Sequence, residues 1–85
     1  MPPVKLRVQR PRIGDKSIFV QADPGINLEI TVYDLDNKVS ETIEHTQKSE
    51  VDEITLNSPL QKRQKVKVRG TKTGKAKGSV TVRTR

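Results

Sequence analysis

Apolar and polar residues alternate with a period of two along most of the chain. The clearest run is residues 23–38, DPGINLEITVYDLDNK, in which Leu28, Ile30 and Val32 alternate with polar side chains or tyrosine. A period of two places alternate side chains on opposite faces of an extended strand, so this run predicts a strand with one buried face. Turn-forming residues stand at both ends of the run, Asp-Pro-Gly before it and Asp-Leu-Asp-Asn after it. We therefore predict that it forms the centre of an antiparallel sheet.

The other alternating segments are short and are separated by turn residues. Their turn signals recur about every 8–12 residues, and no helical period is present. This pattern is typical of an all-β sandwich or small barrel. The predicted strands lie at residues 4–9, 17–22, 27–33, 38–46, 51–56, 64–72 and 79–84.

Three of these strands carry additional information. Residues 38–46 alternate poorly and are rich in Glu and Thr, which predicts an edge strand whose charges discourage pairing with other chains. Val51 is out of phase with Ile54 and Leu56, which predicts a bulge in that strand. Phe19 falls on the face opposite to Ile18 and Val20, so it is predicted to be partly exposed.

Length and composition predict one small domain. The chain has 85 residues, and we assign residues 1–85 to a single domain with residues 1–3 as a linker. Apolar residues make up 31% and aromatic residues 2%, so the core must be a thin layer of Val, Ile and Leu. Cysteine is absent, which excludes disulfides and thiolate metal sites. No apolar run approaches the ~20 residues that span a bilayer, so membrane insertion is not expected.

Charge is distributed unevenly along the chain. The net charge is +7, but residues 1–20 carry +4, residues 21–60 carry −7 and residues 61–85 carry +10. A folded domain with this distribution has a strong dipole, which favours charged partners.

The basic C-terminal third supplies the main candidate binding surface. If the last two strands pair as a hairpin, their outward-pointing basic side chains share a face, and further lysines lie at the tip of the hairpin. Lys5 and Arg7 extend this patch if the first strand lies alongside it. Such a patch suits nucleic acid, heparin-like glycans or teichoic acid, although the interleaved aromatic residues that stack single-stranded bases are missing. The alternative is a solvated face that keeps the domain soluble. The candidate residues are Lys65, Lys67, Arg69, Lys72, Lys75, Lys77 and Arg83.

Catalytic and metal chemistry has little support in the sequence. His45 is the only histidine, lies in a Glu- and Thr-rich strand and is predicted to be a solvated surface residue. We therefore predict no catalytic residues, no enzyme activity and no cofactor. Asp34 and Asp36 offer oxygen ligands, but calcium requires six to eight oxygens, so a turn-forming role is preferred over a weak calcium site between domains.

The order of motifs resembles the bacterial immunoglobulin-like (Big-type) domain of surface proteins and adhesins. The resemblance covers residues 16–84. Two sites depart from the family pattern: Asn37 and Lys38 replace a hairpin glycine, and Lys62-Arg63 stand where a glycine is frequent. The basic C-terminal third is also unusual, because such repeats tend to be acidic. The matching motifs are Pro24-Gly25, residues 28–33, residues 34–37, Pro59-Leu60, residues 66–68, residues 74–78 and residues 79–82.

The resemblance implies an immunoglobulin-like antiparallel β-sandwich of seven strands. It also implies a non-catalytic module of a larger bacterial surface or secreted protein, located outside the cell, at the cell surface or in the cell wall. Such a module acts as a stalk spacer or adhesion unit, contacts neighbouring domains of the same chain and is monomeric in isolation. The competing interpretation is a basic domain that binds nucleic acid or another polyanion. A third is a protein-docking domain that uses Phe19 and Tyr33.

Overall fold

Seven β-strands form the framework of the computed structural model, which describes residues 5–34, 36–74 and 77–84. No helix occurs in these ranges, and so none that is long and apolar enough to cross a membrane. The strands are β1 (Leu6–Val8), β2 (Ser17–Ala22), β3 (Asn27–Tyr33), β4 (Val39–Thr46), β5 (Val51–Thr55), β6 (Lys65–Thr71) and β7 (Gly78–Arg83).

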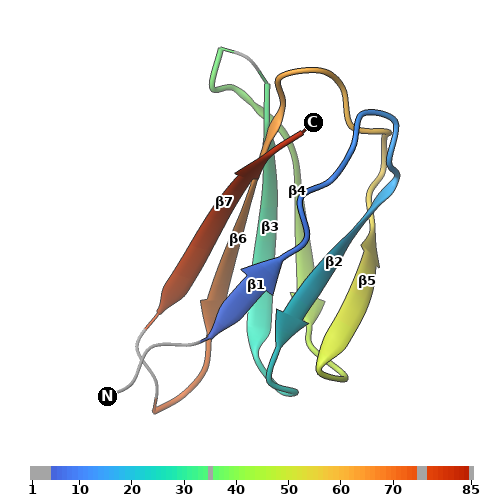
Figure 1. Ribbon diagram of the computed structural model, residues 1–85. Helices are drawn as coiled ribbons and strands as arrows, with labels where there is room; N and C mark the ends of the chain where they lie inside the picture. Colours follow the sequence, from blue (N-terminus) through green and yellow to red (C-terminus); the bar gives the residue numbers. More distant parts are fainter. Residues whose placement is uncertain (1–4, 35, 75–76, 85) are drawn as a thin grey trace.

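The strands form two sheets that pack face to face (Figure 1). One sheet has the order β1-β2-β5 and the other the order β4-β3-β6-β7, and every pairing is antiparallel. The predicted immunoglobulin-like β-sandwich is therefore confirmed. β3 lies between β4 and β6, as predicted for a central strand, and β4 is an edge strand, also as predicted.

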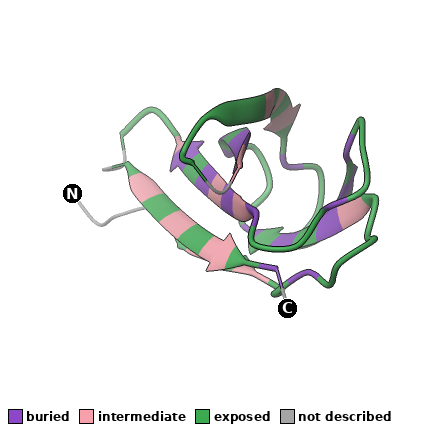
Figure 2. Cartoon of the chain, turned by 90° about the horizontal axis from the view of Figure 1, so that it is seen from above, coloured by how far each residue is buried: buried purple, intermediate pink, exposed green. Residues whose placement is uncertain are grey.

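The core lies between the two sheets, where Figure 2 shows the buried positions gathered. It consists of aliphatic side chains, mostly from the alternating positions that the sequence pattern assigned to the interior. Burial of these side chains provides the main driving force for folding. The buried hydrophobic residues are Ile18, Val20, Ala22, Ile26, Leu28, Ile30, Val32, Ile54, Leu56, Leu60, Val66 and Val68.

The predicted bulge at Val51 is wrong. β5 pairs with β2 without a register shift, and Val51 lies opposite Gln21 on the outer face with 54% of its surface exposed. Val51 is therefore in phase with the strand but faces solvent. The observed irregularity lies between β3 and β4, where Val32 pairs with Glu41 but Tyr33 pairs with Val39.

Several turns contain residues with positive φ angles, and not all of these residues are glycine. Gly25 has φ +90° after Pro24, which fits the predicted Pro-Gly turn. Asn37 (φ +63°) and Arg63 (φ +66°) adopt the left-handed conformation without being glycine. Both lie at the sites where the motif resemblance led us to expect a glycine.

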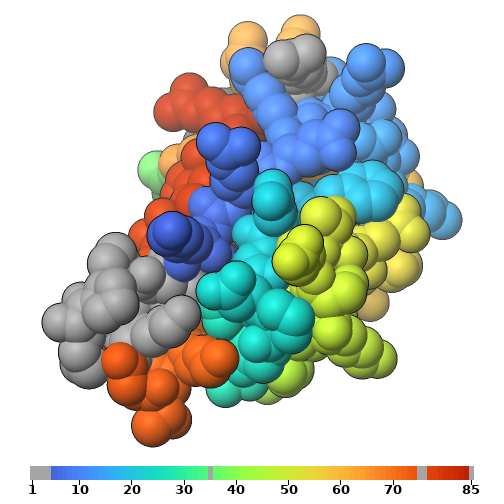
Figure 3. Space-filling view, turned by 60° about the horizontal axis from the view of Figure 1, so that its bottom comes forward, coloured from blue at the N-terminus to red at the C-terminus, as the bar shows by residue number. Residues whose placement is uncertain are grey.

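The described ends of the chain lie at opposite ends of the sandwich. β1 begins at one end in Figure 1, and β7 runs in the same direction and finishes at the other. β1 also packs against β7, as the space-filling view of this end shows (Figure 3), so the first and last strands are neighbours from different sheets. The Cα framework measures 36 × 23 × 18 Å.

Candidate functional site

The β6–β7 hairpin brings basic side chains onto one outer face of the four-stranded sheet. Lys65, Lys67 and Arg69 alternate with buried valines along β6 and therefore point outward. In the ladder with β7, Lys65 lies opposite Arg83 and Arg69 lies opposite Ser79. Lys77 stands just before β7, at the same end of the hairpin as Arg69. We refer to Lys65, Lys67, Arg69, Lys77 and Arg83 as the basic face.

Part of the basic face surrounds a small surface hollow of about 120 Å³. It is lined by Lys67, Arg69, Lys77, Gly78 and Ser79. Three basic residues and one serine thus line one space that is large enough for several water molecules. Such an arrangement can donate hydrogen bonds to an oxyanion, and a guanidinium can donate two in parallel.

The charge of the basic face is not neutralised by ion pairs within the described ranges. The two ion pairs found there are Lys38–Asp36 at 3.7 Å and His45–Asp52 at 2.8 Å. Lys65 donates a hydrogen bond to the amide oxygen of Asn37, which carries no charge. The five cations therefore create a positive potential beyond this face.

The acidic residues of the same sheet lie on its other half. Glu29 on β3 pairs in register with Glu44 on β4, and Arg69 is the neighbour of Glu29 on the other side. The outer surface of the sheet is therefore acidic along β3 and β4 near this row and basic along β6 and β7. A polyanion would be repelled from the first half and attracted to the second.

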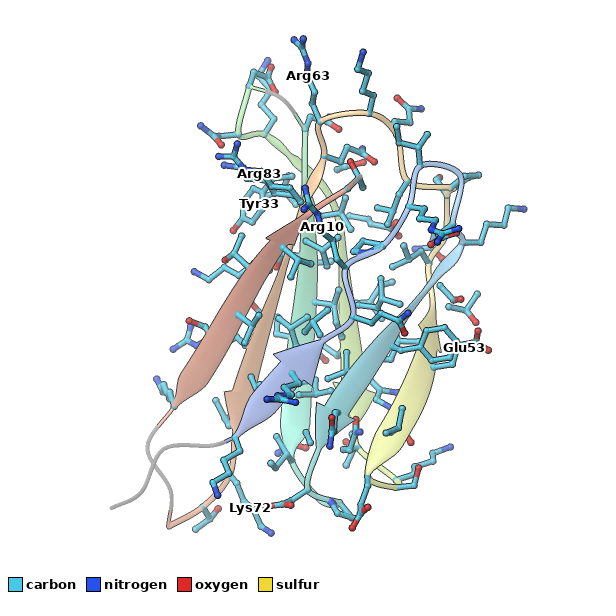
Figure 4. All side chains as sticks on the ribbon, in the orientation of Figure 1. Arg10, Tyr33, Glu53, Arg63, Lys72 and Arg83 are labelled. Carbon is cyan, nitrogen blue, oxygen red and sulfur yellow. The ribbon has the colours of Figure 1, made fainter. Side chains whose placement is uncertain are left out.

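The other residues predicted to belong to the patch are placed differently. The amino group of Lys72 lies 3.8 Å from where a Cβ on Gly25 would be, at the turn that precedes β3, and Figure 4 shows Lys72 at that end of the sandwich. Lys75 is outside the described residues. Lys5 and Arg7 do not extend the patch, because β1 pairs with β2 in the other sheet and both residues line a hollow there with Asp23 and Glu50.

Two further residues, Arg10 and Tyr33, lie next to the basic face, and the sequence analysis did not place them there. Arg10 Nε donates a 3.0 Å hydrogen bond to the carbonyl oxygen of Arg83, which adds a cation at the end of β7. Tyr33 pairs in register with Lys65 and so lies in the same row as Arg83 (Figure 4). No local pattern marks either residue, because Tyr33 is placed by the pairing of β3 with β6, and Arg10 by a contact with a residue 73 positions away.

Phe19 and Tyr33 lie on opposite sides of the molecule. Phe19 is on the outer face of the three-stranded sheet, with 43% of its surface exposed, and shares a hollow with the exposed Val51. Tyr33 is half-buried on the outer face of the four-stranded sheet. A single flat contact surface therefore does not contain both aromatic side chains.

His45 is not the solvated residue that the sequence predicted. Its side chain is 22% exposed and points from β4 toward β5, where Nε2 lies 2.8 Å from Oδ2 of Asp52. The Lys48 amide, the Ser49 hydroxyl and the His45 ring all donate hydrogen bonds to Asp52 and hold the pKa of its carboxyl well below the usual range. A carboxylate accepts hydrogen bonds only, so Nε2 of His45 carries the proton.

Ser49, Asp52 and His45 differ from a catalytic triad in their order. In a triad the histidine lies between the serine and the carboxylate and removes the serine proton. Here the Ser49 hydroxyl donates to Asp52 Oδ1 at 2.7 Å, and the carboxylate lies between serine and histidine. The cluster therefore fixes the turn between β4 and β5 and does not activate Ser49 through His45.

Asp34 and Asp36, the weak metal candidates, already have protein partners. Asp34 Oδ1 accepts a 2.8 Å hydrogen bond from Gln64, and Asp36 pairs with Lys38. The ranges that the structure describes contain no group of three or more His, Cys, Asp or Glu side chains arranged to hold a metal ion.

Comparisons with known proteins give no relative from which function could be transferred. No model of a protein family matches the chain, and no curated protein or solved structure matches it. The functional argument therefore depends on the geometry of the fold and of the basic face.

Proposed function

We propose that this chain is a non-catalytic immunoglobulin-like module of a larger bacterial cell-surface or secreted protein. It acts there as a stalk spacer or adhesion module, outside the cell or in the cell wall, and its partners are neighbouring domains of the same chain. The observation that carries the proposal is the position of the described ends at opposite ends of the sandwich. Modules with this geometry can be joined end to end without folding back on one another. The motif resemblance is consistent with the same role.

A fusion of two copies in tandem tests the spacer function. Residues 1–3 contain two prolines, which favour an extended connection between the copies. Small-angle X-ray scattering should then give a maximum dimension about twice that of one copy, whose Cα framework is 36 Å long. A control fusion with a Gly-Ser connection of equal length should be more compact on average. A tandem that is scarcely longer than one copy would contradict the proposal.

A second candidate function is binding of a polyanion, and the basic face supports it. Five cations gather on half of one sheet, and none of them forms an ion pair with a described residue. Electrostatic attraction of this kind weakens as salt is raised, because bound polyanions release counterions. Titration of the chain with heparin should therefore show an affinity that decreases steeply between low and physiological salt. Absence of binding at both salt concentrations would contradict this second function.

A further inference from the structure

We propose that the hollow lined by Lys67, Arg69, Lys77 and Ser79 binds one sulfate or phosphate ester group of an anionic polysaccharide. The inference rests on the second candidate function and locates its principal contact. The polysaccharide would extend from this hollow along β6 and β7 toward Lys65 and Arg83.

The cross-strand register places the four side chains around a common point. Arg69 and Ser79 are directly opposite each other, and side chains in such pairs have Cβ atoms about 4.5–5.5 Å apart. Lys67 lies two residues before Arg69 and on the same face of β6. Lys77 likewise lies two residues before Ser79. Cations thus approach the hollow along both strands, with the serine hydroxyl beside them.

This donor set suits a tetrahedral oxyanion better than a carboxylate. An ester sulfate or phosphate presents three free oxygens, which can each accept hydrogen bonds from a different side chain. A carboxylate presents only two oxygens, both in one plane, so it is less well matched to side chains that approach from three different positions. Arg69 can donate two parallel hydrogen bonds, while Lys67 and Lys77 act as point charges.

A second group of cations favours a linear polymer over a single ion. The row that contains Lys65 and Arg83 lies four residues along β6 from the row of Arg69, about 13 Å away at about 3.3 Å per residue. Arg10 adds its charge next to Arg83. A chain with anionic groups at intervals can therefore contact both ends of the basic face at once, which increases its effective affinity.

The structure favours a polysaccharide over nucleic acid. Single-stranded nucleic acid is usually bound by several aromatic side chains on which successive bases stack. Tyr33 is the sole aromatic residue of the chain on this face, and it is half-buried. Duplex DNA is read by an element that enters a groove, whereas β6 and β7 lie within a four-stranded sheet and present a flat surface.

The decisive experiment compares two triple variants that remove the same charge. The site variant is Lys67→Ala/Arg69→Ala/Lys77→Ala, and the control variant is Lys16→Ala/Lys48→Ala/Lys62→Ala. The three control lysines are exposed and lie in other segments. Anisotropy titrations of the full chain use a labelled heparin oligosaccharide, a hyaluronan oligosaccharide of equal length, which carries only carboxylates, and a single-stranded DNA oligonucleotide.

We expect the site variant to bind heparin at least about tenfold more weakly and the control variant to lose less than about threefold. The unmodified chain should bind heparin more tightly than either hyaluronan or DNA. Equal losses in both triple variants would overturn the hollow as a site while leaving general polyanion binding in place. Tighter, site-dependent binding of DNA would overturn the polysaccharide. Failure of the unmodified chain to bind heparin would overturn the second candidate function itself.

A single substitution provides an independent check that does not remove any cation. Ser79→Asp adds a carboxylate to the hollow, so it should weaken heparin binding about tenfold without lowering thermal stability. Far-UV circular dichroism confirms that each variant is folded. Unchanged heparin affinity in folded Ser79→Asp would overturn the site.

Discussion

His45 Nε2 lies 2.8 Å from Oδ2 of Asp52, and this contact joins β4 of one sheet to β5 of the other. Asp52 also accepts hydrogen bonds from the backbone amides of Lys48 and Ser49 in the turn between these strands. One carboxylate therefore organises the turn and connects the two layers at this edge of the sandwich.

Acid should destabilise the domain through Asp52. Hydrogen bonds from the Lys48 amide, the Ser49 hydroxyl and His45 lower the pKa of Asp52 in the folded state, whereas an unfolded Asp has a pKa of about 3.9. A group with a depressed folded pKa contributes stability above the unfolded value and loses it as pH falls toward the folded value. We expect the melting temperature to decrease below about pH 4, and Asp52→Asn to flatten this decrease and to be less stable near neutral pH.

Thermal unfolding followed by circular dichroism across this acid range measures the effect. Glu50→Gln is the control, because Glu50 is an exposed acid in the same turn. The control should retain the acid dependence of the unmodified chain. Identical pH profiles for the unmodified chain and Asp52→Asn would contradict the assignment.

Replacing Arg63 by glycine should stabilise the domain. Arg63 has φ +66°, a conformation that costs an L-residue roughly 1–2 kcal/mol. Glycine removes this cost but increases the entropy of the unfolded chain by about 0.4–1 kcal/mol. The net gain for Arg63→Gly should be about 0.5–1 kcal/mol, measured by denaturant unfolding. Lys62→Gly is the adjacent control and should not stabilise the domain. An Arg63→Gly variant that is less stable than the unmodified chain would contradict this account.

Truncation of Ile30, a core side chain of the central strand β3, should strongly destabilise the domain. Ile30 has no exposed surface, and burial of this kind makes Ile→Ala cost about 2–5 kcal/mol. A chain of this size has a total stability of roughly 4–13 kcal/mol, so Ile30→Ala removes a large share of it. Val39→Ala on exposed β4 should change stability by less than about 0.5 kcal/mol. Similar urea midpoints for the two variants would be incompatible with the described core.

Gln64 connects two loops at one end of the sandwich. Its Oε1 accepts a 2.7 Å hydrogen bond from the Gln61 amide, and its Nε2 donates a 2.8 Å hydrogen bond to Asp34. Gln64→Ala should cost about 1–3 kcal/mol, because the Gln61 amide and the half-buried Asp34 carboxylate both lose a hydrogen-bond partner. Gln61→Ala removes an exposed side chain and keeps the amide, so it should be nearly neutral in the same urea titration. Equal effects of the two substitutions would show that the Gln64 bridge contributes nothing.

The sequence predicted strands and their faces well, because alternation is a local property. Leu28, Ile30 and Val32 are buried as their spacing indicated, and Lys65, Lys67 and Arg69 face outward together. The turn at Gly25 followed from the preferences of proline and glycine. Each of these features depends on residues within a few positions of one another.

Pairing over long distances could not be predicted in the same way. The placement of β1 beside β2 separates Arg7 from the basic face, and the approach of Arg10 to Arg83 joins residues 73 positions apart. His45 was expected to be solvated although Asp52 is only seven positions away, because the sequence does not show that the turn between β4 and β5 brings the two side chains together. The dipolar surface of the four-stranded sheet likewise depends on which strands are neighbours.

The arrangement of β1 and β7 has a mechanical consequence. Both strands run in the same direction, and the described ends of the chain lie at opposite ends of the sandwich (Figure 1). Tension applied through these ends would pull β1 along β2 and β7 along β6, parallel to the strands. All hydrogen bonds of each antiparallel ladder then carry the load together, instead of breaking one after another as in a zipper. The fold is therefore built to resist stretching along its 36 Å axis.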